Sequence, residues 1–476
     1  MTDSNKSAAD SSTGRLVIRS TGLRSLRLSL SHITKPSTPF SSTLLLVYGF
    51  AGLILVGSLL LIFPISSASS SFTSPLTALF TATSAVTVTG LVVVDTGSYW
   101  STFGHAVIFC LFQIGGLGFI IGATLMLFAI GGRFGLRDRL LISESMGVNQ
   151  LSGILGLIGK VALFAFIAES IGTLIFYLHW TTTGAAGASW WTALFHSASA
   201  FNNCGLDLFG NFQSLAEFRN DPITLLGTGL LILCGSTGFF IIADILKSRG
   251  FNKLALDTKI VIFTTLALII AGTLFYLIFE SSETSVLGSF SFPQRIILAF
   301  FQAVTVRTAG FSAVDTGNFS QVAILFTVFL MFIGGTTGST AGGIKVNTFG
   351  TLIITVINLI RGREHISAFG RQITNQTIYR AMTLAMVYLA TAGLVVVLLT
   401  ITEQFPIEKL IFETFSAMGT VGASTGITPD LSLGGRIILI VTMFLGRLAP
   451  LTFIAYLVHR HQQVELEYPH ETIKLG

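Results

Sequence analysis

The chain has 476 residues, of which 51% are hydrophobic and only 10% are charged, with a formal net charge of +5. Soluble domains carry about 25% charged residues, so this composition excludes a soluble globular protein and predicts an integral membrane protein. The three cysteines lack the spacing of a disulfide framework or a metal site, and no catalytic constellation is present. We therefore expect no enzyme, no catalytic residue and no cofactor bound by this chain.

Residues 1–40 lack the apolar core of a signal peptide and carry scattered lysines and arginines. We expect them to form a cytoplasmic tail before an uncleaved first span. Two interpretations of this tail stay open. It is either a disordered positive segment beside anionic lipid or an arm that docks a partner.

Apolar runs of about 20 residues predict eight membrane-spanning helices and hence an all-α membrane protein. The runs lie at 44–63, 104–130, 155–178, 223–246, 259–279, 322–358, 379–402 and 435–458.

Between successive odd and even spans, one pattern occurs four times. A short apolar segment opens on phenylalanine and reaches a glycine ten residues later, at Phe80–Gly90, Phe195–Gly205, Phe300–Gly310 and Phe412–Gly422. About ten apolar residues are too few to cross a bilayer, so each segment should enter and leave by the same side. The pattern predicts four tandem helix–pore loop–helix repeats around a central pore. The alternative, small residues for helix packing, would suit one glycine better than four at the same offset.

This division predicts the following organisation: cytoplasmic tail 1–40, pore repeat 1 at 41–131, repeat 2 at 154–246, repeat 3 at 258–360, repeat 4 at 378–460 and cytoplasmic tail 461–476. Lysines and arginines gather in the loops that join the repeats, whereas aspartates and glutamates gather around the pore segments. By the positive-inside rule, both termini are cytoplasmic and the pore loops enter from outside. The acidic outer mouth should concentrate cations.

The short polar stretches that end at the four glycines are candidates for an ion selectivity filter. Backbone carbonyl oxygens can replace the hydration shell of an ion, and glycine lets the backbone approach a pore axis closely. The candidate residues are Thr87, Val88, Thr89, Gly90, Asn202, Asn203, Cys204, Gly205, Thr308, Ala309, Gly310, Gly419, Thr420, Val421 and Gly422. The C-terminal ends of four descending pore helices would favour a cation there.

The second helix of repeat 3 is interrupted by a stretch of glycines and hydroxyl residues. Val322–Ile333 is too short to cross the membrane, so this stretch should lie near mid-depth and form an intramembrane gate. The gate candidates are Gly334, Gly335, Thr336, Thr337, Gly338, Ser339, Thr340, Ala341, Gly342, Gly343 and Lys345. A phosphate-binding loop is the rival interpretation, but the preceding strand and the spacing of a P-loop are missing.

Charged residues inside apolar spans are functional candidates. Arg447 could pair with gate-loop carbonyls, form an electrostatic barrier below the filter, or snorkel to the interface. Arg307 and Lys345 could anchor the structure or act in conduction. Glu169 could be paired or interfacial, with proton relay as the alternative.

Together these residues resemble the membrane subunits of the Ktr/Trk/HKT superfamily of potassium transporters over about 41–460, and the eight expected spans resemble the KtrB branch. The resemblance implies a K⁺ filter, a gate in repeat 3 and an arginine, matched by Arg447, that helps close it. It also implies a homodimer and a cytosolic nucleotide-binding ring of KtrA type. Na⁺ is implied as an activator. Plant relatives that carry sodium have a serine where this chain has Gly90, so K⁺ is the expected ion.

Two other classes remain. The pore subunit of a potassium-pumping ATPase complex would co-purify with a P-type ATPase subunit. A membrane receptor or structural protein with a non-conducting pseudo-pore would bind no cation.

Overall fold

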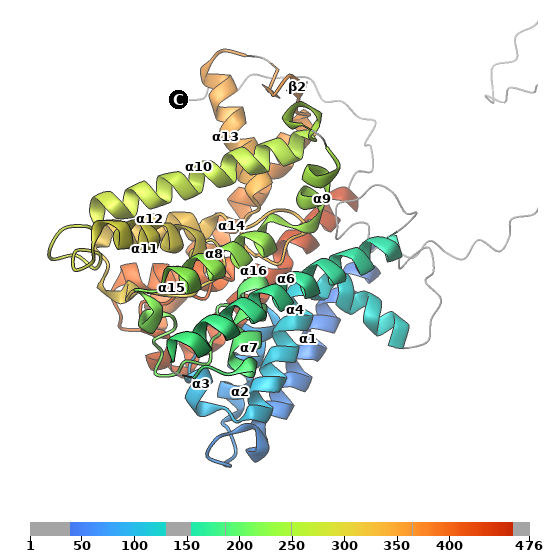
Figure 1. Ribbon diagram of the computed structural model, residues 1–476. Coiled ribbons are helices and arrows are strands. Elements are labelled where there is room, and N and C mark those ends of the chain that lie inside the picture. The colour runs from blue at the N-terminus through green and yellow to red at the C-terminus, as the bar shows by residue number, and fades with distance from the viewer. Residues whose placement is uncertain (1–38, 130–153, 186, 249, 364, 460–476) are drawn as a thin grey trace, which may run out of the picture. The chain divides into compact units, whose positions relative to one another are not determined.

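The computed structural model describes residues 39–129, 154–185, 187–248, 250–363 and 365–459 (Figure 1). The predicted tails, except for Pro39 and Phe40, and the basic loop at 130–153 lie outside the described residues. In the described residues, the long helices are α1 (Pro39–Ile62), α4 (Thr102–Ala129), α6 (Ile154–Thr183), α10 (Leu256–Phe279), α14 (Asn375–Thr402) and α16 (Leu433–His459).

The shorter helices are α2 (Pro75–Val86), α3 (Thr96–Tyr99), α7 (Trp190–Phe201), α8 (Pro222–Thr237), α9 (Phe239–Lys247), α11 (Phe292–Thr305), α12 (Gln321–Phe332), α13 (Val346–Ile360) and α15 (Ile407–Gly419). The strands β1 (Ser367–Ala368) and β2 (Arg371–Gln372) pair in antiparallel register. Such a helical fold agrees with the predicted class.

Several helices begin where their sequence provides a cap. Ser189 and Thr374 accept hydrogen bonds from amides in the first turns of α7 and α14, and Asp221 caps α8. Proline occupies the first turn of α2, α8 and α11, where its missing amide hydrogen is not needed. These local signals fix where the short helices start.

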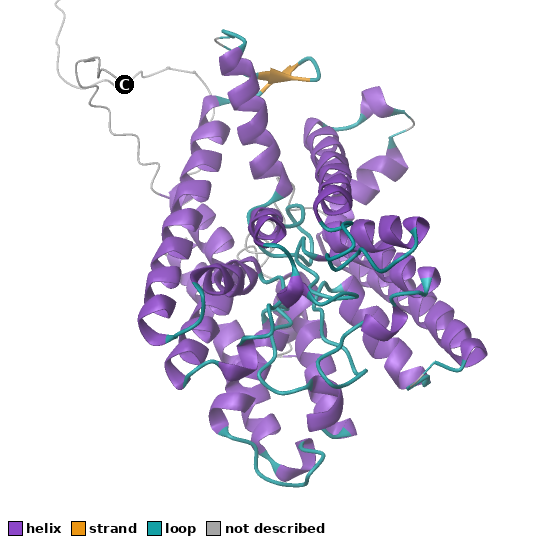
Figure 2. Ribbon diagram, turned by 90° about the vertical axis from the view of Figure 1, so that its left-hand side faces the viewer, coloured by secondary structure: helices purple, strands orange, loops and turns teal. Residues whose placement is uncertain are grey.

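The short helices α2, α7, α11 and α15 make contacts that run in one order. α7 packs against α4, α11 against α8 and α15 against α12, so each of these short helices contacts a helix that follows the preceding short helix in the chain. α2 packs against α16, which joins the first group to the last. Loops from these helices gather among the surrounding helices (Figure 2). The four groups therefore close a ring.

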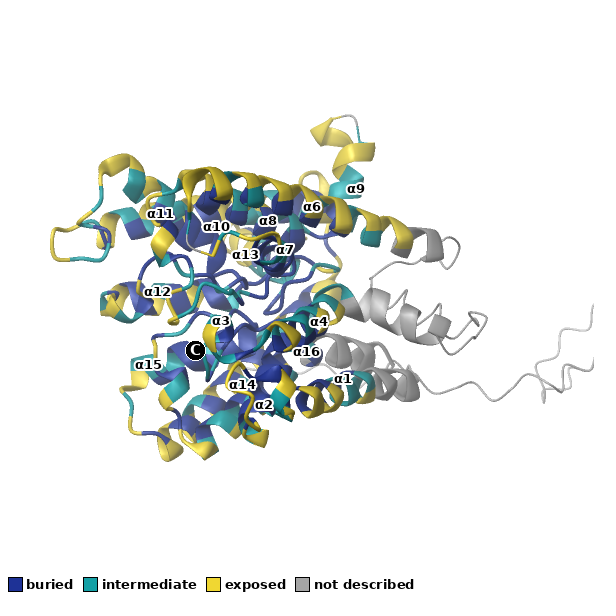
Figure 3. Ribbon diagram, turned by 60° about the horizontal axis from the view of Figure 1, so that its bottom comes forward, coloured by how far each residue is buried: buried dark blue, intermediate teal, exposed yellow. Residues whose placement is uncertain are grey.

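Many large hydrophobic residues of the long helices are exposed. Figure 3 shows exposed positions along the outward faces of the helices. Within the described residues, Gly159–Thr183, Leu256–Phe279 and Asn375–Thr402 are long and apolar enough to cross a membrane. The pair α8 and α9 adds a fourth candidate if the two count as one bent span. Apolar surface of this extent is expected where lipid, not water, covers the helices.

The prediction of one continuous helix at 223–246 is wrong. α8 ends at Thr237, α9 begins at Phe239, and the two axes differ by 89°. Gly238 lies between them with φ of 74°, a left-handed value that glycine adopts without steric cost. The predicted interruption in 322–358 is confirmed, because the chain leaves the helix between Phe332 and Val346.

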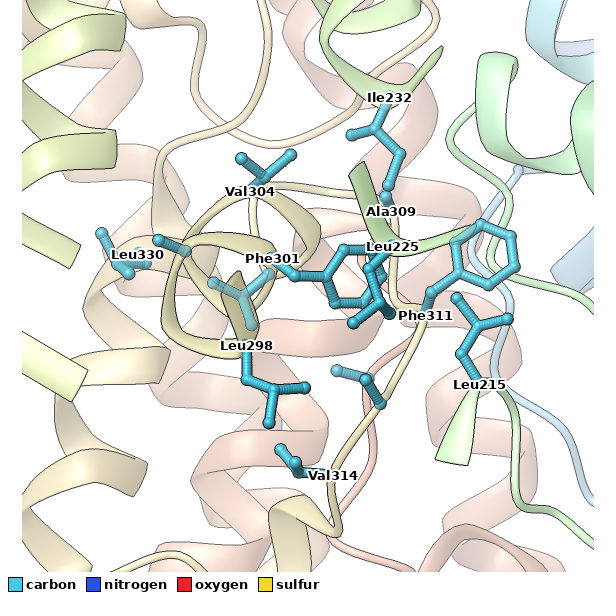
Figure 4. Packing of buried hydrophobic residues seen from close by; sticks show 14 of the residues in the cluster. Leu215, Leu225, Ile232, Leu298, Phe301, Val304, Ala309, Phe311, Val314 and Leu330 are labelled. Carbon is cyan, nitrogen blue, oxygen red and sulfur yellow. The ribbon is translucent and has the colours of Figure 1, made fainter. Parts of the chain in front are cut away.

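A buried apolar cluster surrounds the third short helix. Leu298, Phe301 and Val304 of α11 share this cluster with Leu225 and Ile232 of α8 (Figure 4). Each fully buried aliphatic or aromatic side chain contributes about 1.5–3 kcal/mol relative to exposure. The packing therefore holds α11, and the loop that follows it, against α8.

Candidate functional site

The four glycine loops share one backbone conformation. The residue two places before each glycine has a positive φ, with values of 55° at Val88, 58° at Asn203, 81° at Thr308 and 48° at Thr420. The glycines that follow have φ of 85°, 73°, 74° and 89°. A non-glycine residue pays about 1–2 kcal/mol for this region, so the surrounding structure must hold the loops in place.

The four loops contact one another in a closed ring through backbone atoms. A Cβ atom at Gly90 would collide with the carbonyl oxygen of Cys204, and one at Gly205 with that of Ala309. The same holds for Gly310 with Val421, and for Gly422 with Thr89, which closes the ring. Glycine is therefore required at each junction because the neighbouring carbonyl occupies the side-chain position.

Each loop is tied to its own short helix by a hydrogen bond that spans five residues in the first, second and fourth loops and four residues in the third. In each loop one amide donates to a carbonyl oxygen of the preceding helix at a distance of 2.8 Å. The pairs are Thr89 with Ser84, Cys204 with Ser199, Ala309 with Thr305 and Val421 with Ser416. One amide of each loop is thereby satisfied by the short helix that precedes it. The carbonyl oxygens of the loops remain as the polar atoms that the ring can offer to a cation.

A cavity of about 870 Å³ adjoins the ring and is lined by all four glycines. Asp95, Asp207, Glu217 and Asp315 contribute to its wall. Asp95 also accepts from the Ser98 amide at 2.8 Å and Asp315 from the Gly317 amide at 2.9 Å. These two carboxylates therefore shape their loops as well as adding negative charge to the cavity.

Asp207 lies in the loop beyond the second glycine, outside the helices. Burial raises the pKa of Asp207 to about 6, and the charge of Asp95 adds to the rise. The amide of Phe209 and the hydroxyl of Ser214 lower it in part. The cavity wall thus contains a carboxyl whose pKa lies well above the usual range of an aspartate.

Glu280 and Glu403 are two of the acidic residues near the pore segments that the sequence assigned to the outer mouth. In the structure they bind the starts of helices instead. Glu280 Oε1 accepts from the amide and hydroxyl of Ser320, the N-cap of α12. Glu403 accepts from the amide and hydroxyl of Ser432 just before α16. Both are buried and outside the lining of the cavity, so they join helix ends instead of facing it.

The glycine-rich stretch between α12 and α13 forms a loop that docks on the bend between α8 and α9. The Thr336 amide donates to Ser236 O at 3.0 Å and its hydroxyl to Thr237 O at 2.6 Å. The Thr340 hydroxyl donates to Phe201 O at 3.2 Å. The carbonyl oxygens of Ser236 and Thr237 are free because α8 stops there, which explains the bend that the sequence did not reveal.

The same loop lies directly against the ring. Arg307 donates from Nη2 to Gly334 O at 3.3 Å, and a Cβ at Gly334 would lie 3.2 Å from the Thr308 methyl group. At the other end, Gly342 packs so closely on Thr420 that a side chain would collide with its hydroxyl. The glycine-rich loop therefore contacts the third and fourth loops of the ring.

Arg447 joins the glycine-rich loop to α4. It donates from Nη1 to Thr340 O at 2.5 Å and from Nη2 to Gly115 O at 2.8 Å. Lys345 donates to Ala341 O at 2.6 Å. Of the three interpretations of Arg447, the hydrogen bond to Thr340 O supports pairing with a carbonyl oxygen of the glycine-rich loop. The one ion pair in the described part of the chain joins His179 and Asp221, so carbonyl oxygens are the partners of these cations.

Glu169 is paired. Its carboxylate accepts from Gln113 at 2.7 Å and from the Asn202 side-chain amide at 3.0 Å. The hydrogen bond to Asn202 holds the start of the second loop in position. Sequence reasoning missed Glu413, a fully buried carboxylate in α15. The available signal was its place directly after Phe412, the repeated phenylalanine.

These features define a helical membrane protein in which four equivalent loops close a ring that a fifth, glycine-rich loop contacts. The family described as TrkH, cation transport protein, matches residues 41–467. The chain belongs to this family of membrane transport proteins, which are not enzymes, and the expected resemblance is confirmed.

Three relatives cover nearly the whole chain. Ktr system potassium uptake protein B of Bacillus subtilis is 39% identical over 92% of this chain and 97% of its own length. The protein of the same name from Vibrio alginolyticus is 36% identical over 91% and 94%. Potassium/sodium uptake protein NtpJ of Enterococcus hirae is 36% identical over 91% and 96%.

A solved structure, the potassium transporter TrkH from Vibrio parahaemolyticus, matches with a TM-score of 0.68 over 90% of this chain and 86% of that chain. At 21% sequence identity, this similarity supports the fold.

Proposed function

We propose that the chain is the ion-conducting membrane subunit of a potassium uptake system. The observation that carries the proposal is the ring of four loops with one backbone conformation, each glycine closed by the next loop's carbonyl. The names of the relatives that cover this chain support potassium as the transported ion.

In this proposal the loops at 87–90, 202–205, 308–310 and 419–422 form the filter, and K⁺ binds between their carbonyl oxygens. Carbonyl dipoles compensate dehydration without a fixed charge that would trap the ion. The cavity beside the ring, with its carboxylates, would gather cations before entry.

The loop at 334–345, with Arg447, acts as the gate. The loop lies against Thr308 and Thr420 of two filter loops, and Arg447 ties it to Gly115 of the first repeat. These contacts support a closed state. Opening would require a cytosolic KtrA-type nucleotide-binding ring to pull this loop away. We further propose a homodimer and activation by Na⁺.

The proposed topology has eight membrane spans in four pore repeats, at 41–131, 154–246, 258–360 and 378–460. Both termini would lie in the cytoplasm, so that the cavity faces outward in the cell membrane. The distribution of basic and acidic residues supports this orientation.

The test is potassium uptake by an uptake-deficient bacterium that expresses this chain with a KtrA-type partner, with and without sodium. We expect uptake that requires the chain and increases with sodium. Absence of uptake in both conditions, with the protein correctly inserted, would contradict the proposal.

Potassium uptake is expected to weaken as the external pH falls from 7.5 to 5. The pKa of Asp207 is raised to about 6, so its carboxyl is ionised at the higher pH and neutral at the lower. Loss of this charge from the cavity wall should raise the KM for K⁺ at low pH. In Asp207→Asn the KM should be high at both values; a pH response equal to that of the wild type would count against the assignment.

A further inference from the structure

The position directly after the repeated phenylalanine differs in all four repeats. It is Thr81 in the first, His196 in the second, Phe301 in the third and Glu413 in the fourth. Glu413 is fully buried in α15. The fourth repeat thus places a carboxylate behind its loop, at a site where the others have an uncharged or aromatic side chain.

Glu413 accepts several hydrogen bonds from the segment that follows the fourth glycine. Its Oε1 accepts from the Ser424 hydroxyl at 2.5 Å and from the Thr425 amide at 3.0 Å. Its Oε2 accepts from the Thr428 hydroxyl at 2.8 Å. These bonds tie both oxygens of the Glu413 side chain to the segment, and the Thr425 amide can act only as a donor.

This segment has no regular secondary structure, so its conformation depends on individual hydrogen bonds. Residues 421–427 form neither helix nor strand, and both Gly422 and Gly426 have φ near 90°, at 89° and 88°. The Ser416 hydroxyl bonds to Ala423 O at 2.5 Å. The Thr425 amide has Glu413 as its partner, and a buried amide without a partner is unfavourable.

The third repeat in turn rests on the same segment. The Thr316 hydroxyl donates to Ser424 O at 2.5 Å, and a Cβ at Gly317 would lie only 2.9 Å from Thr425 O. Displacement of residues 424 and 425 would therefore reach two neighbouring loops of the ring.

We propose that Glu413 is a positioning residue for the filter, which holds the fourth loop so that discrimination between K⁺ and Na⁺ depends on it. This inference rests on the proposed function. Glu413 does not touch the ion. It acts through Ser424, Thr425 and Thr428, which hold the chain that follows Gly422 in position.

The test compares Glu413→Ala and Glu413→Gln with Glu403→Ala and Glu403→Gln. Glu403 is a matched control because it is also buried and also accepts from a serine hydroxyl and amide. Its partner Ser432 lies outside the cavity lining, whereas Ser424 and Thr428, the partners of Glu413, belong to it. Uptake of K⁺ is measured against rising Na⁺ and divided by the amount of inserted protein. In Glu413→Ala, Na⁺ should inhibit at about tenfold lower concentration, which corresponds to 1.4 kcal/mol.

Glu413→Gln should fall between Glu413→Ala and the wild type, because its amide oxygen can still accept from Ser424 and Thr425. The Glu403 variants should keep the inhibition constant of the wild type. Wild-type discrimination in both Glu413 variants would overturn the proposal. If Glu413→Ala is not inserted into the membrane, Glu413→Gln and Thr428→Val replace it. Both should be inhibited by Na⁺ at lower concentrations than the wild type, and wild-type discrimination in both would overturn the proposal.

Hydrogen exchange at residues 423–428 separates this proposal from the proposed function, since it needs no conduction. The Thr425 amide of purified Glu413→Gln should exchange several-fold faster than in the wild type. An unchanged exchange rate would overturn the positioning role even if the wild type transports potassium. Absence of uptake by the wild type would instead contradict the proposed function alone.

Discussion

Gly310→Ser is expected to lower the preference for K⁺ over Na⁺ by at least about tenfold, equivalent to 1.4 kcal/mol. Gly310 has φ of 74°, where a non-glycine residue is strained by about 1–2 kcal/mol. A Cβ there would also collide with the carbonyl oxygen of Val421 in the next loop. The serine must displace a backbone atom of the proposed filter, so the spacing of its oxygens changes. Competition between the two ions during uptake measures the effect.

Gly184→Ser is the matched control for this substitution. Gly184 also has a positive φ, at 67°, but a Cβ there meets no atom within 4 Å. The control has the same backbone strain without the collision, so its ion preference should equal that of the wild type. If Gly310→Ser has wild-type preference at normal levels of inserted protein, the third loop does not form part of the filter.

Arg447→Gln is expected to raise potassium uptake in the absence of the cytosolic partner by at least about tenfold. Arg447 bridges Thr340 of the gate loop and Gly115 of the first repeat, and both bonds come from its guanidinium. Bonds to a charged donor are each worth about 1.5–3 kcal/mol, so their loss should favour displacement of the loop. Uptake by cells that express the variant without the partner measures this change.

Arg436→Gln tests whether the effect is specific to the gate. Arg436 lies on the same helix α16 and also donates to two carbonyl oxygens, those of Leu431 and Pro429. It is outside the gate loop's contacts, so uptake by this variant should still need the partner. Uptake by Arg447→Gln that remains fully partner-dependent would show that the bridge does not hold the pore closed.

The elements set by local pattern could be predicted from the sequence. Apolar runs gave the long helices, and the fixed interval between phenylalanine and glycine gave the four loops. The interruption after Phe332 followed from consecutive glycines and hydroxyl residues, which do not support a helix. These features depend on neighbours in the chain, so one sequence is enough to reveal them.

Features that depend on distant contacts could not be predicted. The bend at Gly238 exists where the loop of another repeat binds the last carbonyl oxygens of α8, at Ser236 and Thr237. The sequence around it looks like one apolar helix. Similarly, Glu280 and Glu403 look like mouth residues until their partners, Ser320 and Ser432, are located 40 and 29 residues away.

The most direct test of the central claim is a crystal structure of the protein in Rb⁺ or Tl⁺, with the ion located by its anomalous scattering. We expect ion density within the ring, bounded by the carbonyl oxygens of Thr89, Cys204, Ala309 and Val421. An ordered ring without ion density, in protein that transports potassium in vesicles, would contradict the claim that these four loops form the selectivity filter.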